Sequence, residues 1–141
     1  MSAGTYNWAF VGAGWMAKAQ AANQAVVPGA RVHGVVARTR KSARAFARQF
    51  KATAYESLDA LLADPAIDIV HITTPHPLHY TQAKAALEAG KAVLCEKPFT
   101  LNAKQLEDRS ASARASHSFL MEAMWVRFLP AHLRLLELVD G

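Results

Sequence analysis

The stretch WAFVGAGWMAKA (residues 8–19) joins a short apolar run to an alanine-rich segment through two glycines. The run Trp8–Val11 is typical of a buried strand, and residues 15–25 are typical of a helix. A strand followed by a glycine turn and a helix is the start of a unit in which crossover helices join parallel strands. We therefore predict an α/β fold.

The spacing of the two glycines indicates what this turn holds. Gly12 permits a tight turn, Gly14 lets the backbone approach a ligand closely, and Ala17 is small enough for the helix to pack on the strand. The N-terminus of the helix adds free N–H groups and the positive end of its dipole, which favour a pyrophosphate. The alternative is a tight turn without a ligand. The residues that we expect at the cofactor are Gly12, Gly14, Trp15, Met16 and Ala17.

Strands and helices alternate along the rest of the chain. Strands are expected at residues 32–37, 52–55, 67–72, 92–95 and 118–121, and helices at 41–50, 58–63, 77–89, 103–115 and from 130 onward. This alternation predicts a doubly wound parallel sheet of six strands with helices on both faces. The expected core consists of Phe10, Val11, Val35, Val36, Ile69, Val70, Ile72, Val93 and Leu94.

The composition fits one soluble globular domain. The chain has 141 residues, of which 52% are hydrophobic and 19% charged, so it can bury a sizeable core. No apolar run is long enough to span a bilayer, and the N-terminus lacks the basic region of a signal peptide. Cys95 is the only cysteine, which excludes an internal disulfide. A cytoplasmic location without a membrane partner is the simplest interpretation.

The charged residues are unevenly distributed. The net charge is +5, and residues 1–55 contain eight basic side chains and no acidic one. This asymmetry predicts an anionic partner, either a phosphorylated cofactor or nucleic acid. Nucleic acid is the weaker interpretation, because no aromatic platform accompanies the basic residues. Four of these basic side chains are better explained as a solvated helix face: Lys41, Arg44, Arg48 and Lys51.

The end of the second strand indicates which cofactor is bound. NAD-binding versions of this unit usually carry Asp or Glu there, which accepts a hydrogen bond from the ribose 2′-hydroxyl. Here the strand continues into Arg38, Thr39 and Arg40. An arginine can pair with a 2′-phosphate and stack on adenine, and Thr39 can donate its hydroxyl. We therefore predict NADP rather than NAD, with an exposed basic turn as the alternative.

A histidine-rich loop follows the strand at residues 67–72. Ligands of parallel sheets lie beyond the carboxyl ends of the strands, so this loop should share one crevice with the glycine turn. His71 is expected to face a helix, and no set of carboxylates or cysteines completes a metal site. His79, at a helix start, is best explained by a structural hydrogen bond. We expect His76 to lie at the substrate. The residues expected near the cofactor are Thr73, Thr74, Pro75 and His79.

A second loop begins where the strand at residues 92–95 stops. Glu96 and Lys97 follow at once, and Pro98 prevents the strand from continuing. Adjacent residues on a strand point to opposite faces, so an ion pair between Glu96 and Lys97 would be poor. We therefore expect Lys97 to serve the site.

Together these motifs resemble the N-terminal half of the glucose-fructose oxidoreductase/inositol dehydrogenase family. The resemblance rests on the glycine loop at 12–17, on TPHPLH at 74–79 and on AGKAVLCEKPF at 89–99. Within that family, FLMEAMWVRFLPA at 119–131 resembles the NADP-dependent dihydrodiol and D-xylose dehydrogenase branch. The resemblance extends over the whole chain.

The resemblance implies an architecture and a set of roles. Residues 1–122 would form an NADP-binding Rossmann domain, and residues 123–141 would lead to an absent α+β substrate domain, through which the protein could form a homo-oligomer. Lys97 would be catalytic, beside the nicotinamide and the substrate hydroxyl, in a turn positioned by Glu96 with a cis bond to Pro98. Trp125 and Arg127 would lie near the nicotinamide, and Trp125 would also lie at the substrate.

The implied activity is hydride transfer between NADP and a secondary alcohol of a sugar, polyol or dihydrodiol. The 141-residue chain alone is expected to be inactive, because a partner acid/base would come from the absent domain. The alternative is an NADP(H)-binding sensor without turnover. Lys97 discriminates between the two, because a sensor has no use for a lysine at the nicotinamide.

Overall fold

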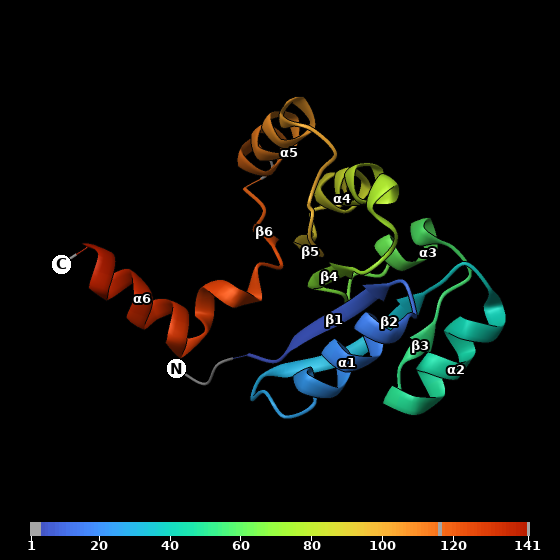
Figure 1. Cartoon of the computed structure of the whole chain (residues 1–141). Helices are drawn as coiled ribbons and strands as arrows, with labels where there is room; N and C mark the ends of the chain where they lie inside the picture. The colour runs from blue at the N-terminus through green and yellow to red at the C-terminus, as the bar shows by residue number, and fades with distance from the viewer. Residues whose placement is uncertain (1–3, 116, 141) are drawn as a thin grey trace.

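The computed structural model describes residues 4–115 and 117–140 as a parallel sheet flanked by helices (Figure 1). The strands are β1 (Tyr6–Val11), β2 (Ala30–Val36), β3 (Thr53–Ala54), β4 (Ile69–Ile72), β5 (Ala92–Cys95) and β6 (Leu120–Glu122). The α-helices are α1 (Trp15–Gln24), α2 (Arg40–Phe50), α3 (Leu58–Leu62), α4 (His79–Glu88), α5 (Ala103–Ala115) and α6 (Pro130–Asp140). Two 3-10 helices are η1 (His76–Leu78) and η2 (Trp125–Phe128).

The strands form one sheet in the order β3-β2-β1-β4-β5-β6, and all neighbouring strands within the described residues are parallel. Val11 at the end of β1 pairs with Val36 of β2 on one side and with Ile72 of β4 on the other. The strand order reverses between β1 and β4, and at such a point the connections diverge and open a crevice. The predicted doubly wound sheet of six parallel strands is therefore confirmed.

Helix α6 projects away from the sheet, and its main contacts are with η2 (Figure 1). It carries exposed leucines at positions 133, 135, 136 and 138.

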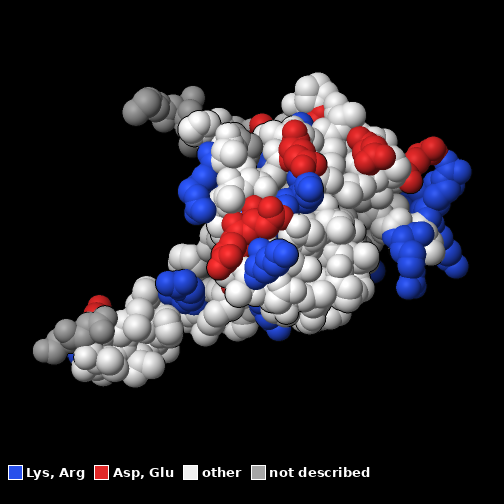
Figure 2. All heavy atoms as spheres, turned by 90° about the horizontal axis from the view of Figure 1, so that it is seen from above, with Lys and Arg blue, Asp and Glu red and all other residues white. Residues whose placement is uncertain are grey.

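On the opposite side of the molecule from α6, where α2 lies, Lys and Arg side chains gather (Figure 2). In the described part of the chain, no helix combines the length and the apolar character needed to cross a membrane.

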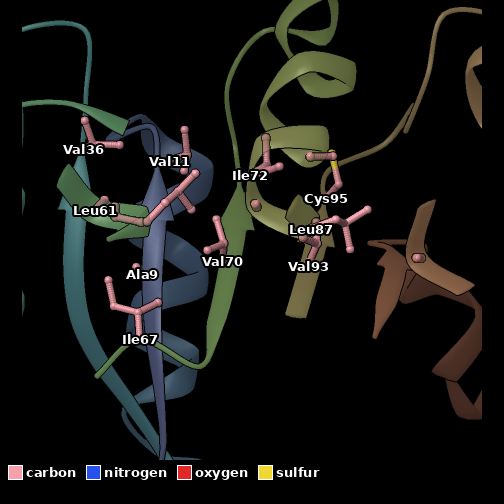
Figure 3. Packing of buried hydrophobic residues seen from close by; sticks show 14 of the residues in the cluster. Ala9, Val11, Val36, Leu61, Ile67, Val70, Ile72, Leu87, Val93 and Cys95 are labelled. Carbon is pink, nitrogen blue, oxygen red and sulfur yellow. The ribbon is translucent and has the colours of Figure 1, made fainter. Parts of the chain in front are cut away.

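The apolar residues of the strands alternate between the two faces of the sheet, and each face has its own core. Phe10 packs with residues of α1 and α2, including Ala17 and Phe46. Its neighbours in β1, Ala9 and Val11, point to the other face and belong to a second core, which includes residues of α3, α4 and α5 (Figure 3). This alternation is the expected consequence of the two-residue period of a strand.

The predicted core is confirmed at seven of its nine positions, since Ile69 and Leu94 are only half-buried. Ile69 is the first residue of β4 and lies at the edge of the core. Leu94 pairs with His71, which pairs with Phe10, so Leu94 lies on the face of the sheet that α1 and α2 cover. These two helices pack against β2 rather than β5, so they leave Leu94 partly exposed.

Several element boundaries differ from those expected. The segment 77–89 is divided into η1 and α4, with Pro77 in the short first helix, where its missing N–H is tolerated. The strand expected at 52–55 is reduced to two residues at the edge of the sheet, and the one expected at 118–121 begins at Leu120. Two helices begin at capping side chains: Ser57 Oγ accepts from Ala60 N at 3.0 Å, and Asn102 Oδ1 accepts from Gln105 N at 3.0 Å.

Asp64 joins several elements at the amino end of the sheet. Its carboxylate accepts hydrogen bonds from the Tyr55 hydroxyl and, at 2.8 Å, from the backbone N–H of Ala66, and lies 3.4 Å from His33 Nε2. Its carbonyl accepts from Lys91 Nζ at 2.8 Å. The Tyr55 hydroxyl, helped by the Ala66 N–H, stabilises the carboxylate and lowers the pKa of Asp64.

We expect Asp64 to make stability depend on pH. Because its folded-state pKa is lowered, its contribution is present above the unfolded value of about 3.9 and is lost as the pH falls through the folded-state value. Urea unfolding of Asp64→Asn should show lower stability at neutral pH and a weaker loss between about pH 5 and pH 3. Asp59→Asn, an exposed carboxylate in the first turn of α3, is the control. The same pH dependence in Asp64→Asn and wild type would contradict the assignment.

Candidate functional site

A cavity of about 750 Å³ lies at the carboxyl ends of β1, β2 and β4. The sequence-predicted residues that line it are Gly12, Gly14, Arg38, Thr39, Thr73, Thr74 and Pro75. Residues that line it but were not predicted include Ser42, Glu56, Leu58, Leu78 and Gln82. The crevice expected at the reversal of strand order is therefore present, with the glycine loop and the basic turn on its surface.

Gly12 lies where the backbone of β1 meets the chain after β4. Its φ is +110°, and a Cβ at this position would lie 2.6 Å from Thr73 Oγ1 and 3.1 Å from the Thr73 carbonyl oxygen. Thr73 Oγ1 donates to Val11 O at 3.0 Å, which keeps the two segments in contact. The predicted tight turn at Gly12 is therefore confirmed, and only glycine fits there without strain.

The rest of the glycine loop divides into open and buried positions. Gly14 precedes α1, and a Cβ there would have no neighbour within 4 Å, so the N-terminus of α1 is accessible. Ala17 is fully buried against Phe10, which confirms its packing role. Trp15 is 76% exposed and Met16 half-buried, and neither lines the cavity. Their contact with a cofactor stays a prediction.

The basic turn after β2 presents its three residues in different ways. Arg38 is exposed and lines the cavity. Thr39 caps α2, because its Oγ1 accepts from Ser42 N at 3.2 Å. Arg40 forms an exposed ion pair with Glu56 and does not line the cavity. A direct role of Arg40 at the cofactor stays a prediction. Of the two arginines of this turn, Arg38 is the one that lines the cavity.

The opposite side of the cavity is formed by the segment after β4. Thr74 Oγ1 donates to Gln82 Oε1 at 2.5 Å, which joins the loop to α4. Gln82 and Leu78 are one helical turn apart, so both face the cavity. Their periodicity in the sequence could have indicated this face, but not that it bordered a cavity rather than the core.

His79 is fully buried and joins two loops. Its Nε2 lies 2.7 Å from Thr74 O and its Nδ1 lies 2.9 Å from Pro98 O. The predicted structural hydrogen bond of His79 is therefore confirmed, and its contact with a cofactor stays a prediction. The exposed His76 ring contacts the His79 ring, with centroids 5.5 Å apart, so His76 lies beside the loop that contains Lys97.

The turn after β5 places Glu96 and Lys97 in different environments. Glu96 is buried, and its Oε1 lies 3.6 Å from His71 Nε2. Lys97 is exposed, and within the described residues it forms no ion pair. The predicted cis bond between Lys97 and Pro98 is confirmed. The catalytic role of Lys97 stays a prediction.

The structure places His71 on the same face of the sheet as Phe10, which α1 and α2 cover, and a contact of its ring with a helix stays a prediction. Its ring packs against the rings of Trp8 and Phe10, with centroid distances of 6.3 and 5.2 Å, and against the buried carboxylate of Glu96. Because His71 pairs with Phe10 across parallel strands, the two side chains are neighbours on the same face of the sheet.

Glu122 and Cys95 lie near this turn, and neither was predicted to belong to the site. Glu122 Oε1 accepts a hydrogen bond from Phe99 N at 2.8 Å. No local pattern indicates this bond, because the partners are 23 residues apart. Cys95 is buried, and burial, with the nearby Glu96 and Glu122 carboxylates, raises the pKa of its thiol. A reactive thiol at this position is therefore disfavoured.

Trp125 and Arg127 lie in η2, beyond the end of β6. Both are exposed and neither lines the cavity, so their place near a nicotinamide stays a prediction. Residues 4–115 and 117–140 contain no group of three or more His, Cys, Asp or Glu side chains arranged to hold a metal ion.

Comparisons with known proteins identify relatives of this architecture. Residues 6–124 match a family described as “Oxidoreductase family, NAD-binding Rossmann fold”. The chain is 47% identical over 90 residues to D-xylose 1-dehydrogenase (NADP(+)) of Hypocrea jecorina, covering 64% of the chain and 23% of that protein. It is 41% identical over 138 residues to trans-1,2-dihydrobenzene-1,2-diol dehydrogenase of Mus musculus, covering 95% of the chain and 41% of that protein.

A solved structure shares both the fold and a fraction of the sequence. KijD10, a 3-ketoreductase from Actinomadura kijaniata in complex with NADP and TDP-benzene, superposes with a TM-score of 0.92 at 28% identity. The match covers 96% of this chain and 42% of that one. The chain thus spans less than half the length of these relatives.

Gly12→Ala should destabilise the chain, whereas Gly14→Ala should not. The added methyl group at position 12 meets Thr73 at a positive φ, and such strain costs about 1–3 kcal/mol. Position 14 has open space and an ordinary φ of −74°. The measurement is urea unfolding of both variants. Equal stability of the two would contradict the close approach of the loops.

Proposed function

We propose that the chain binds NADP and serves hydride transfer to or from a secondary alcohol, because it belongs to the oxidoreductase family with an NAD-binding Rossmann fold. Membership of the family agrees with the resemblance of its glycine and E-K-P motifs. The observation that carries the proposal is that Arg38 lines the same cavity as Gly12 and Gly14. A pyrophosphate at the glycine loop would place the adenosine ribose toward Arg38.

NADP is supported by the charges around this part of the cavity. Arg38 can bind a 2′-phosphate, and the N-terminus of α2 beside Ser42 adds backbone N–H groups. Glu56, the acidic residue that lines the cavity, is paired with Arg40, so its charge is compensated. The name of the Hypocrea relative specifies NADP(+), and KijD10 was solved with NADP.

The chemistry would take place beside Lys97. When bound, the nicotinamide accepts or donates the hydride. Negative charge develops on the substrate oxygen as its proton leaves, and a cation directed at that oxygen stabilises the transition state more than the ground state. Lys97, exposed at the end of β5 and next to the cavity through the His79 contacts, can provide this cation or relay the proton.

The substrate class is an alcohol of a sugar, polyol or dihydrodiol. The names of two relatives, a D-xylose dehydrogenase and a dihydrodiol dehydrogenase, support this class. Because the chain spans less than half of each relative, we assign the remaining substrate contacts and a partner acid/base to residues outside it. The 141 residues alone should therefore bind NADP(H) but turn over little.

Arg38→Ala should weaken NADPH binding while leaving NADH binding nearly unchanged. Hydrogen bonds to charged groups contribute about 1.5–3 kcal/mol, so NADPH affinity should fall about tenfold or more. Fluorescence titration with both cofactors measures the effect. Arg48→Ala, on α2 outside the cavity, is the matched control. Equal wild-type affinities for NADPH and NADH would reject the assignment.

Lys97→Met should lower the chemical rate of the full-length protein about a hundredfold or more, because the group that stabilises the developing charge is lost. NADPH affinity should stay the same, since Lys97 does not line the cavity. Reduction of NADP is measured with D-xylose and with trans-1,2-dihydrobenzene-1,2-diol. Lys84→Met, an exposed lysine of α4, is the control. Full turnover in Lys97→Met would remove Lys97 from the mechanism and favour a different catalytic group.

A further inference from the structure

One peptide group in the turn after Lys97 is held at both of its polar ends. The carbonyl of Pro98 lies 2.9 Å from Nδ1 of the buried His79. The N–H that belongs to the same peptide group, on Phe99, donates to Glu122 Oε1 at 2.8 Å. The two side chains come from opposite sides of the turn, one from α4 and the other from β6.

This arrangement restricts the backbone on the carboxyl side of Lys97. With the ring proton on Nδ1, His79 donates to the Pro98 carbonyl, and the peptide plane then has a hydrogen bond at each end. A peptide plane with only one hydrogen bond can rotate about that bond, whereas bonds at both ends fix its orientation. Phe99 adds a third restraint, because its side chain is buried in the core. The backbone of the turn is therefore restrained, although Lys97 and Pro98 are exposed.

The position of Glu122 follows from its strand. β6 pairs with β5 so that Glu122 is the register partner of Cys95, and Ala123 N donates to Cys95 O at 2.8 Å. The carboxylate of Glu122 therefore meets the chain just after β5 ends. It forms no ion pair with any described residue, so its hydrogen bond to Phe99 is the interaction that explains a half-buried carboxylate here.

We propose that Glu122 is a positioning residue for Lys97, acting through its hydrogen bond to the backbone N–H of Phe99. This inference rests on the proposed function of Lys97. Glu122 acts as a hydrogen-bond acceptor and not through its charge. Loss of the acceptor leaves the Phe99 N–H unpaired, allows the turn to rotate and moves Lys97 away from the position in which it can stabilise the reacting oxygen.

The test compares Glu122→Ala and Glu122→Gln in the full-length protein, with D-xylose and trans-1,2-dihydrobenzene-1,2-diol as substrates. A misplacement of about 1 Å can cost about a hundredfold in rate, so kcat of Glu122→Ala should fall about tenfold to a hundredfold. NADPH affinity should remain within about twofold, because the cavity does not include Glu122. Glu122→Gln keeps an oxygen acceptor and should recover most of kcat, with an unshifted pH profile.

Two controls separate positioning from folding. Hydrogen exchange at the Phe99 amide should be faster in Glu122→Ala than in wild type and slow again in Glu122→Gln. Asp108→Ala removes a carboxylate from the contact of α4 and α5, through its bond to Tyr80, and should leave kcat unchanged. Its thermal unfolding shows how much stability can be lost without loss of rate.

The outcomes distinguish the two proposals. Absence of wild-type turnover with both substrates would overturn the proposed function, and the positioning role with it. An active wild type with an equally active Glu122→Ala would overturn the positioning role and leave the proposed function intact. Glu122→Gln as slow as Glu122→Ala, with a shifted pH profile, would also overturn it, because the charge of Glu122 would then be what matters.

Discussion

The absence of a side chain at Gly12 allows β1 and β4 to end side by side. Thr73 donates both its backbone N–H, at 2.9 Å, and its hydroxyl to the carbonyl of Val11. These bonds bring the glycine loop against the segment after β4, so close that a Cβ would overlap Thr73. The cavity lies between these segments and the turn after β2, and its shape therefore depends on this contact.

The candidate site consists of two parts with different supports. The cavity is built on β1, β2 and β4, whereas the turn with Lys97 is built on β5 and β6. His79 joins them, because one ring nitrogen meets the carbonyl of Thr74, at the cavity, and the other meets the carbonyl of Pro98, in the turn. A buried imidazole between two backbone carbonyls therefore sets the position of one part relative to the other.

The parts of the site that could be predicted from the sequence are those with a local pattern. The two glycines, Arg38 at the end of a strand and the E-K-P turn each combine residue type with position along one segment. Ser42, Glu56 and Gln82 line the cavity because distant segments meet there, and Glu122 reaches a backbone N–H 23 residues away. The neighbours of His71 could not be indicated for the same reason, since their identity depends on strand order.

The division of the core between two faces also has a consequence for synthesis of the chain. The core around Phe10 and Phe46 contains buried residues from Phe10 to Ala47 alone, so it can assemble once that segment has been made. The other core includes residues from Ala9 to Ala113 and must wait for the later strands. Until then the face of β1 that carries Ala9 and Val11 is only partly covered, and long loop closures of this kind slow folding. A nascent chain of this topology therefore exposes part of one face of its sheet until the later strands and helices have been made.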